Sequence, residues 1–316
     1  MMDFLNKDVV SIKDFSRPEL EKIFSTAERM EERGYDKSLL HGKRVGLLFY
    51  EPSTRTRLSF DTAAQGIGAD TIWFAGTEGT SVMKGETLKD TIETVANYVD
   101  AIVMRHPFDG SARWAAEITT RRTHRGENKV PIISGGDGKN EHPTQTMLDL
   151  YSILKTQGKL DGLDIAMVGD LKYGRTVHSL SYALSMFNCR ISFVAPDMLQ
   201  IPDHVTSFLN GKCIPFRKCS KIEDTMGTAD IVYMTRIQKE RFSDENEYNK
   251  VKGLYKIDQK MLQLAKPTMK LMHPLPRVDE IAIDADDDAR AYYFKEAGNG
   301  VPVRAALLSL VMGAVA

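Results

Sequence analysis

The chain has 316 residues, and its 42 Lys and Arg side chains almost balance its 43 Asp and Glu side chains, which leaves a formal net charge of −1. This length corresponds to about two domains of roughly 150 residues each. Apolar residues at 42% and charged residues at 27% exclude intrinsic disorder, collagen and a coiled coil as the main architecture. The balanced charge argues against a protein that binds nucleic acid over a broad basic surface.

The cysteines and the two ends of the chain indicate the compartment. Cys189, Cys213 and Cys219 are odd in number and lack CxxC spacing, so we expect neither a disulfide framework nor a metal site. The N-terminal MMDFLNKDVV has no apolar run of the kind a signal peptide needs. The C-terminal AALLSLVMGAVA is shorter than the ~20 residues of a membrane span and predicts a buried helix. We therefore expect a cytoplasmic protein that does not enter a membrane.

Short β-rich runs alternate with helical patterns along the chain. The first strand is RVGLLFY (44–50), and a helix follows from about Ser53. The later runs that predict strands are DTIWFA (70–75), DAIVMR (100–105), VPII (130–133), LDIAMVGD (163–170), RISFVAP (190–196), KCIPF (212–216), DIVYMTR (230–236) and MKLMH (269–273). Helical stretches lie between most of them, for example at 143–157 and 174–187. This alternation predicts an α/β protein with two parallel sheets flanked by helices, bridged by helix 143–157.

The stretch FYEPSTRTRLSF (49–60) has the features of an anion-binding site. A strand ends just before Pro52, which cannot continue it, and hydroxyl residues then open a helix. The start of a helix offers unpaired backbone N–H groups and the positive end of the helix dipole. An ordinary Ser/Thr cap beside surface arginines is the alternative, but a position at a strand end favours phosphate binding. The side chains that would add donors are those of Ser53, Thr54, Arg55 and Thr56.

Two His-Pro motifs stand at the ends of predicted elements, one after a strand and one at the start of a helix. MRHP puts Arg105 and His106 at the end of strand 100–105, and HPTQ puts His142 and Gln145 at the start of helix 143–157. Ligands of open α/β sheets bind at the carboxyl ends of strands. A structural role remains open for each histidine. The basic segment TTRRTHRGENK (119–129) could bind phosphate or a partner, but a solvated surface excursion between a helix and a strand is the favoured interpretation.

Seven motifs occur in a fixed order along almost the whole chain: STRTR, SVMKGETLKDT, MRHP, HPTQTMLDLY, GDLKYGRTVHSL, MTRIQKERF and HPLPR. Together they resemble the transcarbamylase family, and within it the catalytic chains of aspartate carbamoyltransferases. The resemblance implies two similar Rossmann-like domains joined by bridging helices. We expect a carbamoyl phosphate-binding domain at 1–142, completed by a C-terminal helix at about 292–316, and an aspartate-binding domain at 150–291.

The resemblance also implies the reaction. The carbamoyl group of carbamoyl phosphate is transferred to the α-amine of L-aspartate, giving N-carbamoyl-L-aspartate and phosphate in pyrimidine biosynthesis, without a cofactor. By this resemblance the Ser53–Thr56 turn holds the phosphate, Arg105 bridges phosphate and carbonyl oxygen, His142 donates to that oxygen, and Gln145 contacts the carbamoyl amine. Attack by the amine builds negative charge on the carbonyl oxygen, so Thr56, Arg105 and His142 suit an oxyanion-type site. No covalent intermediate is expected, and the group that accepts the amine proton stays open, with the departing phosphate as one candidate.

The second substrate carries two carboxylates, which require further cations. By resemblance Arg175 of GDLKYGRT holds the α-carboxylate, while Arg236 and Gln238 of MTRIQKER hold the side-chain carboxylate. A merely charged loop around residues 236–241 is the alternative interpretation. The resemblance further assigns Glu51 and Arg241 to interdomain ion pairs that hold a closed state.

The motif HPLPR (273–277) would contribute backbone carbonyl groups that bind the substrate amines. The resemblance assigns this role to Pro274, Leu275 and Pro276. A cis Leu-Pro bond would suit such a tight backbone site, whereas the alternative is an ordinary Pro-rich turn.

The Gly-flanked segment EGTSVMKGETLKD (78–90) alone predicts a mobile surface loop. In the family, a serine and a lysine of this loop reach the active site of a neighbouring subunit. Lys84 matches the lysine, and Ser81 is favoured over Thr80 as the hydroxyl residue. A homotrimer with shared active sites is therefore implied, and a separate regulatory chain remains an option.

Three alternatives compete with this hypothesis. Ornithine carbamoyltransferase is opposed by Pro274, where the sister pattern has Cys, and by Lys84 and Arg236, which would repel a cationic side chain. A dinucleotide-binding dehydrogenase is opposed by MVGDLKYGRT (167–176), where Lys172 and Arg175 stand in place of the glycines of GxGxxG. A non-catalytic transcarbamylase-like subunit is opposed by the presence of each expected active-site residue type.

Overall fold

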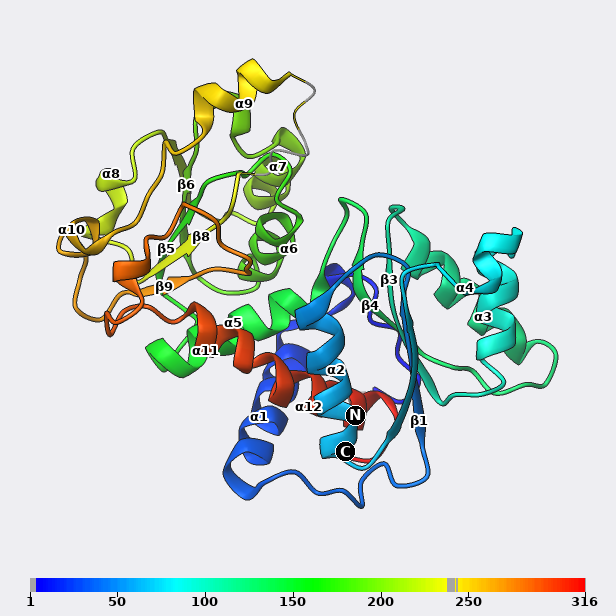
Figure 1. The fold of residues 1–316 in the computed structure, drawn as a ribbon. Coiled ribbons are helices and arrows are strands. Elements are labelled where there is room, and N and C mark those ends of the chain that lie inside the picture. The colour runs from blue at the N-terminus through cyan, green and yellow to red at the C-terminus, as the bar shows by residue number, and fades with distance from the viewer. Residues whose placement is uncertain (1–3, 238–241, 243, 316) are drawn as a thin grey trace. The chain divides into compact units, whose positions relative to one another are not determined.

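The structure is a computed structural model, and it describes residues 4–237, 242 and 244–315 (Figure 1). Two compact units make up this part of the chain. Unit 1 contains the residues up to Met147 and those from Gly298 onward, and unit 2 contains Leu148–Ala297. Helix α5 (Pro143–Gln157) begins in unit 1 and continues into unit 2. No helix of the described residues is long and apolar enough to cross a membrane.

Unit 1 is built on a parallel sheet with strand order β2-β1-β3-β4. The strands are β1 (Arg44–Phe49), β2 (Asp70–Ala75), β3 (Ala101–His106) and β4 (Ile132–Asp137). The other elements of this unit are η1 (Ile12–Asp14), α1 (Arg17–Arg33), α2 (Thr54–Gly66), η2 (Ser81–Lys84), α3 (Leu88–Val95), α4 (Ser111–Thr123) and α12 (Gly300–Val311). The middle parts of β1 and β3 are buried apolar runs, as expected for parallel strands covered on both faces, and β4 is buried as well although it ends in Ser134, two glycines and Asp137.

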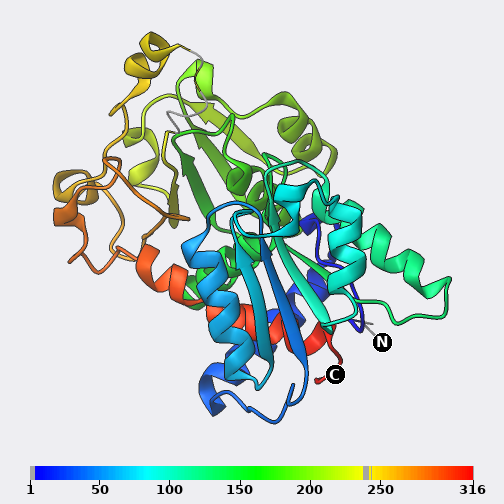
Figure 2. The same cartoon turned by 45° about the vertical axis from the view of Figure 1, so that its right-hand side comes forward.

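The helices of unit 1 lie in two layers, one on each face of the sheet. Figure 1 shows α1, α2 and α12 on one face and α3 and α4 on the other, and Figure 2 shows the strands running between α2 on one side and the α3–α4 layer on the other. Helix α12 packs against both α1 and α2, and its residues from Pro302 to Val311 are buried. The apolar run near the C-terminus therefore forms a buried helix, as predicted.

Unit 2 has a second parallel sheet with strand order β7-β6-β5-β8-β9. The strands are β5 (Asp164–Val168), β6 (Arg190–Val194), β7 (Phe216–Cys219), β8 (Ile231–Met234) and β9 (Lys270–Met272). The helical elements are α6 (Arg175–Leu184), η3 (Asp197–Leu199), α7 (Asp203–Gly211), α8 (Glu223–Met226), α9 (Glu245–Val251), α10 (Gln259–Leu262), η5 (Ile283–Ala285) and α11 (Tyr293–Gly298). The prediction of two parallel sheets flanked by helices is confirmed.

Two predicted elements differ from the structure. The run KCIPF (212–216) is not a strand, because Cys213 has a φ of +56° and turns the chain; the strand β7 begins only at Phe216. The single helix expected at about 292–316 is two helices, α11 and α12, which meet at Asn299. The sequence AGNG at this point has two glycines, which disfavour a continuous helix.

Candidate active site

The predicted phosphate-binding turn forms the link between β1 and α2. Ser53 is the residue that precedes α2, and its extended backbone (φ −156°, ψ 101°) turns the chain into the helix at Thr54. The Ser53 side chain makes no capping hydrogen bond. The first N–H groups of a helix have no partner within the helix, so this end of α2 presents donors and a positive dipole end to a bound anion.

The ends of β1 and β3 lie side by side and bring Arg105 to this turn. Phe49 pairs with Arg105 in the parallel register, and the Tyr50 N–H donates to the Arg105 carbonyl at 2.9 Å. The Arg105 guanidinium makes an ion pair with Glu51, with 2.7 Å between Nε and Oε1. Its Nη1 also donates to the Gly135 carbonyl at 3.4 Å. The structure thus places Glu51 on Arg105 within unit 1, and its predicted part in domain closure stays a prediction.

Arg55 and Arg105 are close enough to disfavour each other's charge. Burial, and then the positive charge of Arg105, lower the pKa of Arg55. Arg55 still remains protonated, because an arginine does not lose its proton at physiological pH. Two guanidinium groups near the positive end of a helix create a positive electrostatic potential. This potential attracts a multiply charged anion, whose binding would reduce the repulsion between the two groups.

Thr56 and His142 are both buried and face each other in unit 1. The Thr56 Oγ1 lies 3.4 Å from the His142 Nε2. The Gln145 N–H donates to the His142 carbonyl at 3.0 Å and also to His142 Nδ1 at 3.3 Å, a geometry that favours Nδ1 as an acceptor and Nε2 as the nitrogen that carries a proton. With this arrangement Nε2–H can donate a hydrogen bond to a carbonyl oxygen. The fold brings together Thr56, Arg105 and His142 from three separate segments.

The predicted loop residues Ser81 and Lys84 form the short helix η2. Both side chains are exposed to solvent, and the neighbouring Met83 is 67% exposed. Their predicted place in the active site of another subunit stays a prediction.

The carboxyl ends of β5 and β8 form the corresponding region of unit 2. The Thr235 N–H donates to the Val168 carbonyl at 2.8 Å, so the segment before Arg236 lies beside the turn that leads to Arg175. Gly169 is required there: its φ is +113°, and a Cβ would lie 2.2 Å from the Thr235 carbonyl oxygen. Arg175 is the first residue of α6, and both arginines are half-buried. Gln238 and Arg241 lie outside the described residues.

The HPLPR turn follows β9 in the same unit. The Leu275–Pro276 bond is cis, which the sequence had left open, and Leu275 has a φ of +57°. The Leu275 N–H donates to His273 Nδ1 at 2.7 Å, and His273 Nε2 lies 2.7 Å from the Glu280 carboxylate. Arg277 makes an ion pair with Asp286. A framework of side chains therefore holds the turn from both ends.

The sequence analysis missed the buried acids of unit 2. Asp149 in α5 and Glu296 in α11 have no exposed surface. A signal existed for Asp149, because its neighbours Met147, Leu148 and Leu150 are apolar and a charged residue among them must find partners inside the protein.

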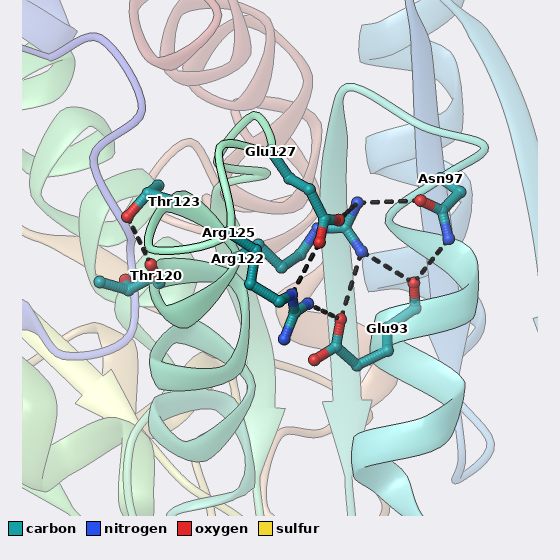
Figure 3. Close-up of polar contacts among 7 residues, drawn as sticks. All are labelled: Glu93, Asn97, Thr120, Arg122, Thr123, Arg125 and Glu127. Carbon is teal, nitrogen blue, oxygen red and sulfur yellow. Dashed lines mark hydrogen bonds and ion pairs between the residues drawn. The ribbon is translucent and has the colours of Figure 1, made fainter.

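Most of the basic segment 119–129 is exposed and leads from α4 toward β4, as the favoured interpretation expected, but Arg122 is buried. Residues 119–123 are the end of α4. Figure 3 shows the contacts that hold this part of the chain: Arg122 and Arg125 both contact Glu93 of α3 and Glu127. Their distances to Glu93 Oε2 are 3.3 and 2.6 Å, and those to the Glu127 carboxylate are 2.6 and 2.7 Å. The same Arg122 donates to Asn97 at 2.9 Å, so the network joins α3 to the end of α4.

Comparisons with known proteins agree with this geometry. The family model described as "Aspartate/ornithine carbamoyltransferase, carbamoyl-P binding domain" matches residues 7–155, and the model for the Asp/Orn binding domain matches residues 161–311. The chain is 52% identical to the aspartate carbamoyltransferase catalytic subunit of Chromobacterium violaceum over 308 residues, which cover 97% of this chain and 98% of the relative. It is 48% identical to that of Thermococcus gammatolerans, with 99% of both chains covered.

Solved structures extend the comparison. The catalytic subunit of M. jannaschii aspartate transcarbamoylase is similar with a TM-score of 0.88 and 47% identity, covering 97% of this chain and 98% of that one. The aspartate transcarbamoylase of Trypanosoma cruzi, in complex with carbamoyl phosphate and aspartate, is similar with a TM-score of 0.89 and 36% identity, covering 98% of both chains.

Proposed function

Because the chain belongs to the aspartate/ornithine carbamoyltransferase family, we propose that it transfers the carbamoyl group of carbamoyl phosphate to the α-amine of L-aspartate. The products are N-carbamoyl-L-aspartate and phosphate. The observation that carries the proposal is the convergence of Thr56, Arg105 and His142 beside the open end of α2. The relatives named as aspartate carbamoyltransferases, and the solved complex with both substrates, support this specificity over ornithine.

The first substrate binds to unit 1 through its phosphate. The N–H groups at the start of α2 and the Arg55 guanidinium hold the phosphate oxygens, where an anion relieves the repulsion between Arg55 and Arg105. Arg105 exchanges its partner Glu51 for the substrate, while Gln145 binds the carbamoyl amine. The His142 Nε2–H, fixed by the Gln145 N–H, points its proton at the carbonyl oxygen.

The transfer proceeds by addition and elimination. The lone pair of the amine forms the new C–N bond, the carbonyl oxygen takes negative charge, and the C–O bond to phosphate then breaks with its electron pair leaving on phosphate. The amine loses one proton to the departing phosphate or to another base. Thr56, Arg105 and His142 stabilise the oxyanion, and removal of one such donor typically costs about 2.7–4 kcal/mol in the barrier.

The second substrate binds to unit 2 through its carboxylates. Arg175 holds the α-carboxylate, Arg236 and Gln238 hold the side-chain carboxylate, and the backbone carbonyls of Pro274, Leu275 and Pro276 bind the amine. A guanidinium at Arg236 attracts the carboxylate of aspartate and repels the ammonium group of ornithine. Arg241 and Glu51 contribute to closure of the domains.

The proposed assembly is a homotrimer in which Ser81 and Lys84 complete the site of a neighbouring chain. Its support is the exposure of η2 together with that of the edge strand β2, where Trp73 is 56% exposed. Exposed apolar side chains on a sheet edge are typical of surfaces that another chain covers. We further propose a cytoplasmic enzyme of pyrimidine biosynthesis, which could associate with a separate regulatory chain.

The test is a colorimetric assay for the ureido group formed from carbamoyl phosphate. With L-aspartate and a metal chelator present, the purified chain should form product at a rate that depends on both substrates. The control replaces L-aspartate by L-ornithine and should give at least about a hundredfold less product. Absence of product with aspartate, or equal rates with both amines, would refute the proposal.

A further inference from the structure

Two carboxylic acids lie fully buried beneath the HPLPR turn of unit 2. Asp149 belongs to α5 and Glu296 to α11, and neither has exposed surface. The Tyr233 hydroxyl of β8 donates to Asp149 Oδ2 at 2.9 Å. The backbone N–H of His273, at the end of β9, donates to Glu296 Oε2 at 2.8 Å. The two acids therefore stand between the helix α5 and the first residue of the turn.

These acids are close enough to interact, which decides their protonation. Burial, and then the negative charge of Asp149, raise the pKa of Glu296 well above its usual value. The Glu296 Oε1 is buried, and no hydrogen-bond donor among the described residues faces it. A carboxylate in this position would be an unpaired buried charge beside another, whereas a proton on Oε1 turns the oxygen into a donor to Asp149. Tyr233 stays a phenol, because burial and then the charge of Asp149 raise its pKa well above the usual value. The cluster then carries its negative charge on Asp149, which accepts from the hydroxyl groups of Tyr233 and Glu296.

We propose that Glu296 is a positioning residue that links Asp149 of α5 to the backbone N–H of His273 and so fixes the substrate-binding turn 274–276. The inference rests on the proposed function, in which the carbonyls of that turn bind the amine of aspartate. Glu296 does not touch the substrate. It acts through His273.

The contacts of His273 carry this effect to Leu275. Its Nδ1 accepts the Leu275 N–H at 2.7 Å, so its Nε2 holds the ring proton and donates to Glu280 at 2.7 Å. Although burial raises the pKa of Glu280, the hydrogen bond and charge of His273 lower it below its usual value, so this carboxylate is the charged partner. Leu275 has a φ of +57°, a conformation that a residue with a side chain adopts only when its surroundings impose it. A chain of contacts therefore runs from Asp149 through Glu296 and His273 to the backbone that presents the carbonyl groups.

The consequence is specific to the second substrate. When Glu296 is neutral, its C=O accepts from His273 and its O–H donates to Asp149. A glutamine has the same shape, the same acceptor and an N–H donor, so it should replace Glu296 with little loss. A leucine of similar size has neither group, leaves the His273 N–H without a partner, and frees the start of the turn. The expected defect is in the KM for aspartate, while the affinity of unit 1 for phosphate is unchanged.

The experiment compares wild type, Glu296→Gln, Glu296→Leu and the matched control Glu223→Gln, an exposed glutamate in α8 of the same unit. Steady-state kinetics give kcat and KM for aspartate, calorimetry gives the affinity for inorganic phosphate, and thermal unfolding checks that each variant folds. Infrared difference spectra between wild type and Glu296→Gln, recorded in H₂O and D₂O at neutral pH, report a protonated carboxylic acid by its carbonyl band.

We expect Glu296→Leu to raise the KM for aspartate by about tenfold or more, with kcat changed less and phosphate affinity unchanged. Glu296→Gln and Glu223→Gln should stay within about twofold of wild type. The protonated-acid band should be present in wild type and absent from Glu296→Gln, and this result holds even if Glu296→Leu fails to fold. An unchanged KM in a folded Glu296→Leu variant, a defect in Glu296→Gln as large as in Glu296→Leu, or absence of the band would overturn the inference. A wild-type chain that makes no carbamoylaspartate but shows the band would refute the proposed function and leave the protonation of Glu296 established.

Discussion

Replacement of Arg55 by alanine should weaken phosphate binding while it stabilises the ligand-free protein. Arg55 stands at the start of α2, where its own partial burial and the charge of Arg105 lower its pKa. This means that the charge of Arg105, although paired with Glu51, still disfavours the charged form of Arg55 in the ligand-free protein. The variant therefore loses the attraction between Arg55 and phosphate in the complex, which lowers the unfolding temperature with phosphate present. It also loses the repulsion between Arg55 and Arg105 in the ligand-free protein, which raises the unfolding temperature without phosphate.

The size of the binding effect follows from the bonds lost. A hydrogen bond to a charged group contributes about 1.5–3 kcal/mol, and a guanidinium can make two in parallel. Although the guanidinium is partly enclosed by the protein, Arg55 as a whole is exposed to solvent, which screens the interaction, so the lower half of that range applies. A loss of about 1.5–2.2 kcal/mol corresponds to a dissociation constant for phosphate that rises about 10- to 40-fold. The matched control is Arg57→Ala, since Arg57 lies over the Trp73 ring at 4.3 Å, and it should change phosphate affinity by about twofold or less.

Two measurements test this reasoning together. Calorimetric titration with inorganic phosphate gives the dissociation constants, and thermal unfolding with and without phosphate gives the stabilisation, which depends on the ratio of ligand concentration to dissociation constant. Arg55→Ala should unfold at a temperature equal to or above that of wild type without phosphate, and should gain much less when phosphate is added. An unchanged phosphate affinity, or an equal loss in Arg57→Ala, would show that Arg55 does not bind the anion.

Three further outcomes are expected. Mixing Lys84→Ala chains with Arg105→Ala chains, with mixed trimers verified by mass, should restore part of the activity, because in each mixed trimer some sites receive both intact residues; no recovery would argue against shared sites. The folded state raises the pKa of Glu296 above 4.5, the usual value of this group. As the pH rises above 4.5, wild type should therefore lose stability relative to Glu296→Gln, by at most about 1.4 kcal/mol per pH unit in urea unfolding. A stability difference that does not depend on pH would contradict the raised pKa. Arg122→Met should destabilise the protein by about 2–4 kcal/mol in urea unfolding, since Arg122 is buried between two glutamates, whereas Arg125→Met should cost clearly less, because solvent screens the exposed Arg125; equal losses would mean that burial does not distinguish the two arginines.

The alternation of apolar runs and helical patterns was enough to predict both parallel sheets. It failed at KCIPF, where a β-like composition does not reveal that Cys213 adopts a positive φ and delays the strand to Phe216. At 119–129 the expected surface segment is found, but a row of basic residues gives no sign that Arg122 is buried against Glu93, which is distant in the sequence. Local patterns therefore do not show a single backbone angle such as that of Cys213, or a contact between distant residues such as that of Arg122 with Glu93.

Part of the candidate site could also be predicted from the sequence, and part could not. The order of the motifs predicted site residues at the ends of β1 and β3 and at the start of α5, because a parallel sheet brings the ends of its strands together. The orientation of the His142 ring depends on a backbone N–H at Gln145 and was not predictable from residue types. The proximity of Asp149 and Glu296 was equally hidden, since one belongs to a helix in mid-chain and the other to a helix near the end.

Helix α12 delays the completion of unit 1 during protein synthesis, because unit 1 needs residues from both ends of the sequence. The Arg304 guanidinium of this helix donates to Ser59 of α2 at 2.6 Å and lies over the Phe60 ring, while the helix also packs on α1. The ribosome makes the other residues of unit 1 first, then the whole of unit 2, and only then α12. At roughly 5–20 residues per second, the apolar surface of α1 and α2 waits for its last partner for roughly 8–30 s. Unit 2 is continuous in sequence and can be folded by then, so unit 1, whose synthesis begins first, is the last to be completed. Until then, the nascent chain exposes an apolar surface to which a ribosome-associated chaperone can bind.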